Sequence, residues 1–505
     1  MLHDIGAPAN REHAVMLVVL RLHFPVPIEN PEPYLRRAWQ IMGQQYPALG
    51  SSLSPANTAD PQARSKLTVS HFTPEGWVRS TFSAHPDCKD VDSLFSGMGR
   101  PSTTRCCWLP GPGQIVVWSS HWRTDGVGLA LLSDSFLSAL ANVIRLGLLV
   151  PLEAYPVQQA PDPPLRPALE TLAQSQSRYA SEAYTPLLRR AADELVNKFA
   201  KGLPSIGFPT IVGSEATLPG PASRAAVILD AATTAKVASS CRSLGVSVTC
   251  AVHAAIIYAA ARFPQHPLAK SYAAFGPVDL RRPLLARGIE YSSQPYGVLL
   301  TGLPICIEGL ANGSKGPTKD FATVARELHA VYSQDSARFW DLDDDSGKSV
   351  SLLELVELYL GQLIKLCAAP IPDNFPPVTA PDLSSLGKVE RYLRHEYPFG
   401  DDPESKVEVV DFWIGNEIMT RALQFHLWSW KDELVLSATW NQSFYNKGFV
   451  ATTLNKIMRE LYIGLRIDKL DKGAAKGQSD PLTELSNGNL PYRFTPNDTC
   501  VWGQV

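Results

Sequence analysis

The chain has 505 residues, of which 45% are hydrophobic and 19% are charged, and its formal net charge is −3 at pH 7. This length allows two or three domains with cores of their own, and the composition is that of an ordinary globular protein. A nearly neutral chain of this kind lacks the charge surplus with which proteins attract nucleic acids or anionic membranes.

The eight cysteines are scattered along the chain, and none of them forms a C-x-x-C pair. This spacing favours neither a zinc site nor a disulfide framework, so reduced thiols in a cytoplasmic protein are the plain interpretation. The N-terminal residues show no basic segment followed by an apolar core, so we expect no secretory signal. No stretch is convincing as a membrane-spanning segment.

The first elements in chain order alternate between strand and helix. An apolar run over residues 14–24 predicts a strand, and apolar residues at helical spacing then predict a helix that stops near Tyr46. We expect weaker strands over residues 67–72 and 77–82, and a helical region over residues 168–201.

The central stretch, residues 114–126, reads QIVVWSSHWRTDG. Its apolar run predicts a buried strand, and an amphipathic helical pattern begins at Val127. His121 is therefore expected where the strand ends and a loop begins, and Asp125 and Gly126 close that loop into the helix. A side chain at the end of a strand is held by a rigid element and can still face a cleft, which suits a reactive group.

A Pro/Gly-rich run over residues 202–222 is the expected boundary, which divides the chain into residues 1–205 and 206–505. The second part again alternates between strands and helices. Its expected strands cover residues 224–229, 272–278, 298–307, 407–413, 418–428 and 433–440, and its expected helices cover residues 231–244, 245–263, 320–333, 352–366 and 448–465. This alternation predicts a mixed α/β protein.

The hexapeptide HWRTDG at residues 121–126 resembles the H-x-x-x-D-G signature of the chloramphenicol-acetyltransferase-like superfamily, which includes peptide-synthetase condensation domains and plant BAHD acyltransferases. Further stretches resemble segments of that superfamily in the same order; they are residues 35–50, 245–261, 275–285, 382–390 and 436–445. The likeness spans about residues 14–465. Within the superfamily, the chain is most similar to fungal stand-alone acetyltransferases of the trichothecene 15-O-acetyltransferase type.

The resemblance implies two chloramphenicol-acetyltransferase-like subdomains, each a mixed sheet flanked by helices, arranged as a V with a tunnel between them. It implies an acyl-CoA-dependent O-acyltransferase that esterifies a hydroxyl of a secondary metabolite, with acetyl-CoA as the expected co-substrate and with no permanently bound cofactor or metal. One chain would hold both subdomains, so a monomer is expected, with no nucleic-acid or membrane partner.

The resemblance also assigns roles to four residues. His121 would be the general base, because an unperturbed histidine pKa of about 6.5 suits proton transfer near neutral pH. Asp125 would turn away from the substrate and pair with Arg281, which would tie the two halves together behind the base. Gly126 would let the chain turn tightly into the helix. Alternatively, Asp125 caps the helix, His121 is a core histidine and Arg281 is a surface arginine.

Residues expected along the tunnel are Trp122, Tyr296, Ser384, Ser385 and Asn441. A backbone group or a hydroxyl, with the two serines as candidates, would stabilise the oxyanion.

Two positions depart from the patterns of relatives. Ser120 stands where condensation domains often carry the first of two histidines, and residues 411–415 (DFWIG) match the BAHD motif Asp-Phe-Gly-Trp-Gly only loosely. The first departure favours a free-standing acyltransferase over a peptide-bond-forming module, and the second argues against a plant-type BAHD enzyme. A condensation-type enzyme with a carrier-protein-bound donor and a non-catalytic binding protein on the same fold stay open as alternatives.

Overall fold

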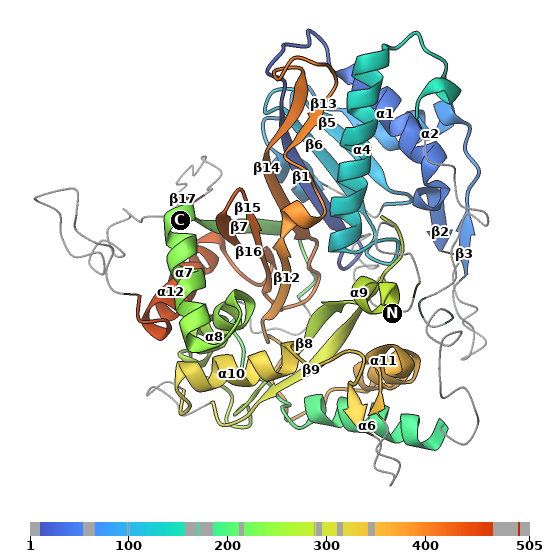
Figure 1. The fold of residues 1–505 in the computed structure, drawn as a ribbon. Coiled ribbons are helices and arrows are strands. Elements are labelled where there is room, and N and C mark those ends of the chain that lie inside the picture. Colours follow the sequence, from blue (N-terminus) through green and yellow to red (C-terminus); the bar gives the residue numbers. More distant parts are fainter. Residues whose placement is uncertain are drawn as a thin grey trace, which may run out of the picture. The chain divides into compact units, whose positions relative to one another are not determined.

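The computed structural model describes residues 11–53, 66–97, 99, 101–156, 169, 171, 185–211, 217–286, 288, 295–310, 317–341, 349–467 and 493–494. Its packing divides the chain into two compact units, whose elements are labelled in Figure 1. Unit 1 comprises Met1–Gln176, Asp279–Leu300 and Lys388–Glu417, and unit 2 comprises Ser177–Val278, Thr301–Gly387 and Ile418–Val505.

This division corrects the expected split into residues 1–205 and 206–505, because two segments from late in the sequence belong to unit 1. The physical reason is strand pairing. β14 (Lys406–Asn416) pairs antiparallel with β1 (Met16–His23) along its length, with one register shift near Arg21. A Pro/Gly-rich run marks a connection, but it carries no information about which distant strands pair.

The sheet of unit 1 has six strands in the order β13-β14-β1-β6-β5-β4. The strands not yet introduced are β13 (Glu396–Pro398), β6 (Gln114–Ser119), β5 (Arg105–Leu109) and β4 (Phe82–Ala84). β1 runs antiparallel to both of its neighbours, so that Met16 pairs with Ser119 and with Asn416. The start of β1 and the ends of β6 and β14 therefore lie together at one end of the sheet.

Two helices, α1 (Glu32–Gln45) and α4 (Gly126–Leu146), pack together in unit 1, and α4 also contacts strands β1, β13 and β14 (Figure 1). The expected apolar stripe of α4 is fully buried; it includes Leu129, Leu132, Phe136 and Leu140. By length and composition α4 could cross a membrane, but 61% of its most apolar 18-residue stretch is buried within the structure. We therefore describe α4 as a core helix, whose apolar sequence is explained by this packing.

One expected strand of unit 1 is wrong. Residues 77–82 were expected as a strand, but α2 (Pro74–Thr81) is a helix that precedes β4. The Thr73 side chain accepts a hydrogen bond from the Gly76 amide, and Pro74 occupies the first helical turn. These residues are a typical helix start. Other short elements are the 3-10 turns Pro47–Gly50, Leu152–Ala154 and Val389–Arg391, the helix α3 (Val91–Gly97), and the paired strands β2 (Ser51–Leu53) and β3 (Leu67–Val69).

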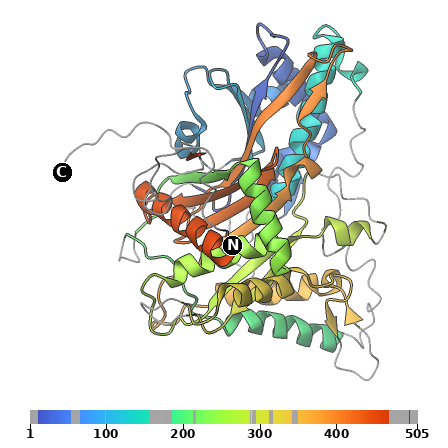
Figure 2. The ribbon, with the colours of Figure 1, turned by 60° about the vertical axis from the view of Figure 1, so that its left-hand side comes forward.

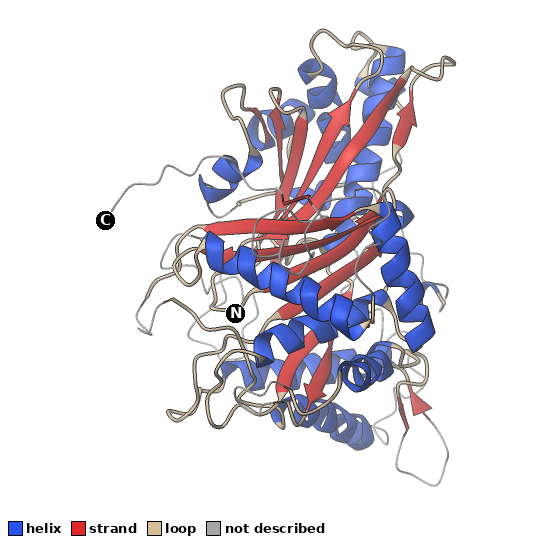
Figure 3. Ribbon diagram, turned by 90° about the vertical axis from the view of Figure 1, so that its left-hand side faces the viewer, coloured by secondary structure: helices blue, strands red, loops and turns tan. Residues whose placement is uncertain are grey.

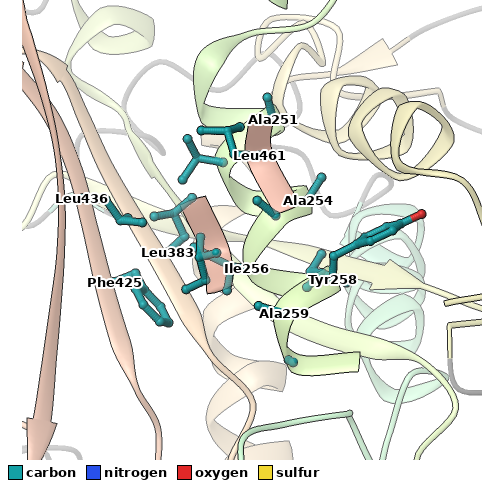
Figure 4. Close-up of a cluster of buried hydrophobic side chains, with 14 of the residues drawn as sticks. Ala251, Ala254, Ile256, Tyr258, Ala259, Leu383, Phe425, Leu436 and Leu461 are labelled. Atoms are coloured by element: carbon teal, nitrogen blue, oxygen red, sulfur yellow. The ribbon is translucent and has the colours of Figure 1, made fainter. Parts of the chain in front are cut away.

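The main sheet of unit 2 has the order β12-β15-β16-β7-β17. Its strands are β12 (Asp382–Lys388), β15 (Gln424–Trp430), β16 (Glu433–Asn441), β7 (Ala222–Leu229) and β17 (Arg493–Phe494). Figure 3 shows helices packed along these strands; α7 (Ala231–Leu244), α8 (Val248–Ala261) and α12 (Lys447–Gly464) belong to this unit. Figure 4 shows how Ile256 of α8 points toward Leu383 and Phe425 of the sheet.

A second layer of unit 2 contains the paired strands β8 (Tyr272–Asp279) and β9 (Leu300–Ile307) and the helix α10 (Phe321–Tyr332). The short helix α9 (Arg281–Leu285) belongs to unit 1. α6 (Thr185–Ala200) packs against α11 (Leu352–Ala368), and both are visible in Figure 2. The hairpin of β10 (Trp340–Asp341) and β11 (Ser349–Val350) is small. The expected helix over residues 168–201 is present as α6, and most of residues 168–184 lie outside the described part.

The prediction of an α/β fold with sheets flanked by helices is confirmed by these elements. In the second part the predicted strands and helices occur in the predicted order, but the strand expected over residues 418–428 begins only at Gln424, and the short elements α9, β10, β11 and β13 (Glu396–Pro398) were not predicted.

Candidate active site

The loop between β6 and α4 carries the predicted base. We call residues 120–125 the His121 loop. Its flanking residues are buried, with Ser120 and Thr124 at 0% exposure, Asp125 at 2% and Arg123 at 5%. His121 and Trp122, in the middle of the loop, are partly exposed. The loop therefore presents two side chains from a backbone that is held on both sides.

Asp125 holds the C-terminal side of the loop. One carboxylate oxygen accepts a hydrogen bond from the Gly128 amide at 2.8 Å, which caps α4. The other oxygen accepts hydrogen bonds from the Leu299 amide at 2.9 Å and from Arg281 Nη1 at 3.0 Å. The structure therefore brings Asp125 and Arg281 together, and the capping alternative and the ion pair hold at the same time.

Arg281 is the first residue of α9 and is only 3% exposed. Its Nη1 also donates to Asp279 at 2.9 Å. Burial by itself lowers the pKa of Arg281, but the charges and hydrogen bonds of Asp125 and Asp279 outweigh this and raise it. The guanidinium therefore stays charged between two carboxylates. Arg281 belongs to unit 1 with Asp125, so the ion pair joins distant parts of the sequence within one unit.

A short segment, residues 295–299, runs alongside the His121 loop. Thr124 Oγ1 donates to the carbonyl of Pro295 at 2.7 Å, and the Gly297 amide donates to the carbonyl of Arg123 at 2.6 Å. Tyr296, which was expected along the tunnel, lies between these contacts and is 7% exposed. Its ring centroid is 6.1 Å from that of Tyr46. The loop is therefore fixed by a segment more than 170 residues away in sequence.

Arg123 and Glu12 hold the N-terminal side of the loop. Ser120 Oγ donates to Glu12 Oε2 at 3.1 Å, and Arg123 Nη1 donates to Ser120 Oγ at 3.0 Å. Arg123 also donates to the carbonyls of Ser51, at 2.8 Å, and Ser102, at 2.6 Å. Burial lowers the pKa of Arg123 to about 10, and the charge of Glu12 opposes this shift, so Arg123 is charged at neutral pH.

A second buried carboxyl, Glu417, lies at the same end of the sheet. It follows β14 and forms an ion pair with Arg11. Burial raises the pKa of Glu417 to about 7; the charge of Arg11 lowers it, and the charge of Glu12 raises it further. Glu417 therefore titrates close to neutral pH beside the segment that precedes β1.

No protein-family model matches the chain. Among solved structures, the chain is similar to TRI3 trichothecene 15-O-acetyltransferase from Fusarium sporotrichioides, with a TM-score of 0.70 and 16% identity over 92% of this chain and 94% of that chain. It is also similar to the first condensation domain of the calcium-dependent antibiotic synthetase, with a TM-score of 0.57 and 15% identity over 91% and 94% of the two chains.

The chain has the fold of the condensation-domain and chloramphenicol-acetyltransferase-like acyltransferases. The predicted resemblance is thereby confirmed at the level of the fold, including the likeness to a fungal trichothecene 15-O-acetyltransferase.

Several curated relatives match most of the chain. A protein of Epichloe uncinata named loline biosynthesis cluster 1 transcription factor lolU1 is 28% identical over 91% of this chain and 92% of its own length. The O-acetyltransferase pigM of Monascus ruber is 26% identical, with coverages of 91% and 82%. The acetyltransferase pigO of Monascus ruber is 23% identical, with coverages of 92% and 94%.

The other expected tunnel residues have different surroundings. The Trp122 ring lies under the guanidinium of Arg123, 4.0 Å from its carbon. Ser384 and Ser385 lie on β12 of unit 2 and are partly buried, and Ser385 Oγ is 2.9 Å from Thr249 Oγ1 at the start of α8. Their contribution to an oxyanion site stays a prediction.

The prediction that Asn441 lines a tunnel is wrong. Its side chain is at 0% exposure and makes four hydrogen bonds to the backbone. Its oxygen accepts from the amides of Gly220 and Ser443, and its amide group donates to the carbonyls of Gly220 and Ile418. All of the usual hydrogen-bonding capacity of Asn441 is thus used to hold unit 2 together.

Gly126 is the first residue of α4. The crowded glycine is Gly128, where a Cβ would lie against Thr124 Oγ1 and 2.8 Å from the carbonyl oxygen of Pro295. Sequence reasoning missed this position, as it missed Glu12 and Arg123. The only sequence signal for Arg123 was that an arginine stands inside the motif, whereas nothing in the local sequence indicates Glu12.

Among the residues that the structure describes, no three or more His, Cys, Asp and Glu side chains gather in a way that could hold a metal ion.

Proposed function

We propose that this protein is an acyl-CoA-dependent O-acyltransferase, specifically an acetyltransferase acting on a hydroxyl of a secondary metabolite, with His121 as the general base. The observation that carries the proposal is the His121 loop, which presents a partly exposed histidine while Asp125 is turned away into an ion pair with Arg281. Two relatives named as acetyltransferases and the acyltransferase fold support the same reaction.

The reaction needs one base and no covalent enzyme intermediate. The acceptor oxygen attacks the thioester carbonyl while His121 takes the hydroxyl proton. The tetrahedral intermediate then collapses, the carbon–sulfur bond breaks, and the imidazolium returns the proton to the departing thiolate. The products are an ester and free CoA. A positioned general base contributes about 10²–10⁴-fold to the rate of such reactions.

Asp125 takes no proton in this scheme. Its carboxylate already accepts hydrogen bonds from Gly128, Leu299 and Arg281, so its role is to hold the loop. A partly exposed His121 and an Asp125 whose carboxylate is already hydrogen-bonded fit direct transfer of the acyl group from the thioester to the acceptor.

The experiment that tests the proposal follows thiol release from acetyl-CoA in the presence of hydroxyl compounds, including a trichothecene with a free 15-hydroxyl and simple polycyclic alcohols. Acceptor-dependent thiol release and an acetylated product in the mass spectrum are expected. The proposal fails if no acceptor in a broad panel is acetylated, or if His121→Ala releases thiol at the wild-type rate.

Two rivals are separated by the same assay. A condensation-type enzyme would transfer the acyl group from a phosphopantetheine-loaded carrier protein and not from acetyl-CoA. A non-catalytic regulator is raised by the name of the Epichloe uncinata relative; it predicts no turnover with either donor.

A further inference from the structure

The segment before β1 lies beside the His121 loop because of the strand register. Met16 pairs with Ser119 in the antiparallel β1–β6 ladder, so the residues that precede Met16 continue past the residues that follow Ser119. The contact between Glu12 and Ser120 shows that this neighbourhood persists beyond the last ladder pair. His13 adjoins Glu12, and His121 adjoins Ser120.

The same segment is fixed on its other side by the chain that follows β14. The Ala14 amide donates to the carbonyl of Glu417 at 2.7 Å, and the Glu417 amide donates to the carbonyl of Val15 at 2.8 Å. Residues 12–15 are therefore held between the ends of two strands. The backbone of His13 is therefore held at the end of the sheet where the His121 loop begins.

We propose that His13 is a positioning residue of the acyl-transfer site, an uncharged imidazole held beside His121 that stabilises the proton which His121 takes from the acceptor. This inference rests on the proposed function. It assigns His13 an action through His121 and no direct contact with the reacting atoms.

The electrostatics of the two rings support this arrangement. Burial, and to a smaller extent the charge of His121, lower the pKa of His13 to about 4. Near neutral pH, the His13 imidazole is therefore uncharged. A neutral imidazole is a strong dipole that can face a neighbouring cation with a ring nitrogen, and poorly solvated surroundings strengthen this interaction.

Other charged groups surround this end of the sheet. Glu12 and Arg123 lie on either side of Ser120, and Glu417 is paired with Arg11. Because Glu417 titrates near pH 7, its charge must be kept constant when the rings are compared. Titrations in the Glu417→Gln background separate its effect from that of His13.

The test compares His13→Phe with His13→Gln and His13→Asn. Phenylalanine keeps the ring shape without a dipole, whereas the two amides place polar atoms near the positions of the two ring nitrogens. We expect His13→Phe to lower kcat by roughly tenfold or more with little change in KM. We expect one of the two amide variants to retain kcat within about threefold. His23→Phe, at the opposite and exposed end of β1, is the matched control and should have wild-type kinetics.

A second readout needs no substrate. Carbon–proton NMR correlation spectra follow the His121 ring through a pH titration, with His121→Ala used for assignment. We expect the midpoint to move to lower pH in His13→Phe and to return toward the wild-type value in the better amide variant. An unchanged His121 midpoint and an unchanged kcat in His13→Phe would overturn the inference. So would a midpoint that moves equally in the Phe variant and in both amide variants.

The two proposals fail in different ways. A wild-type protein that acetylates nothing refutes the proposed function, while the titration still decides whether the rings are coupled. A wild-type protein whose activity depends on His121 but not on His13 refutes the inference alone. If His13→Phe does not melt cooperatively, the amide variants carry the comparison, and loss of activity in both with an unmoved His121 midpoint contradicts the positioning role.

Discussion

Replacement of Asp125 by alanine should weaken the fold and the reaction together. The substitution removes the helix cap, the Leu299 contact and one of the two carboxylates that face Arg281, which is 3% exposed. Removal of one partner of a buried ion pair costs about 3–5 kcal/mol, because the remaining charge stays buried. Loss of an N-cap alone costs about 1 kcal/mol. The loss of the cap adds to the cost of the broken ion pair, whereas Asp279 still compensates part of the Arg281 charge and reduces that cost. We therefore expect a total cost near the upper end of the ion-pair range.

Urea unfolding followed by far-UV circular dichroism measures this cost. Asp230→Ala is a matched control, because Asp230 caps α7 through the Thr233 amide and is exposed. It should lose only about 1 kcal/mol. The double variant Asp125→Ala/Arg281→Met should be more stable than Asp125→Ala alone, because the unpaired charge is gone. If Asp125→Ala costs no more than Asp230→Ala, the argument from the buried pair is refuted.

Three further predictions follow from the contacts of single residues. Gly128→Ala should destabilise the protein by about 1–3 kcal/mol through overpacking and should reduce activity. Gly361→Ala, at a position in α11 where a Cβ meets no other atom, should stabilise the protein by about 0.5–1 kcal/mol, and thermal melts compare the two variants. The folded protein binds a proton at Glu417 more tightly than the unfolded chain does, so stability should fall as pH rises from about 4.5 to about 7, and urea midpoints should show a smaller fall in Glu417→Gln. Asn441→Ala should lower the free energy of unfolding in urea by about 1–3 kcal/mol and leave the KM for acetyl-CoA unchanged. A rise in KM would instead indicate that Asn441 contacts the substrate.

Much of the fold could be predicted because local patterns were strong. The apolar run before Ser120 and the helical stripe after Gly126 give the strand, loop and helix around His121 almost to the residue. The helix α2 was missed because an apolar pair, Trp77 and Val78, outweighed the capping residues before it. Unit boundaries could not be predicted, because the pairing of β14 with β1 joins residues almost 400 positions apart.

The candidate site likewise contains residues that the sequence indicated and residues that depend on strand pairing. The motif itself indicated His121 and Asp125, and the resemblance indicated Arg281. Glu12 and His13 could not be found, because their place depends on the antiparallel register between β1 and β6, which the residues themselves do not specify. The role of Asn441 was misjudged because the neighbouring sequence does not reveal that its side chain is hydrogen-bonded to the backbone of Gly220 and Ile418.

The most direct measurement is the acceptor-dependent rate of CoA release by His121→Ala relative to wild type, with melting temperatures recorded for both. We predict a fall of at least about 100-fold at an unchanged melting temperature, because a general base is lost from a loop whose anchors, Asp125 and Arg123, are intact. A variant that melts like wild type and still releases CoA at a comparable rate would contradict the account.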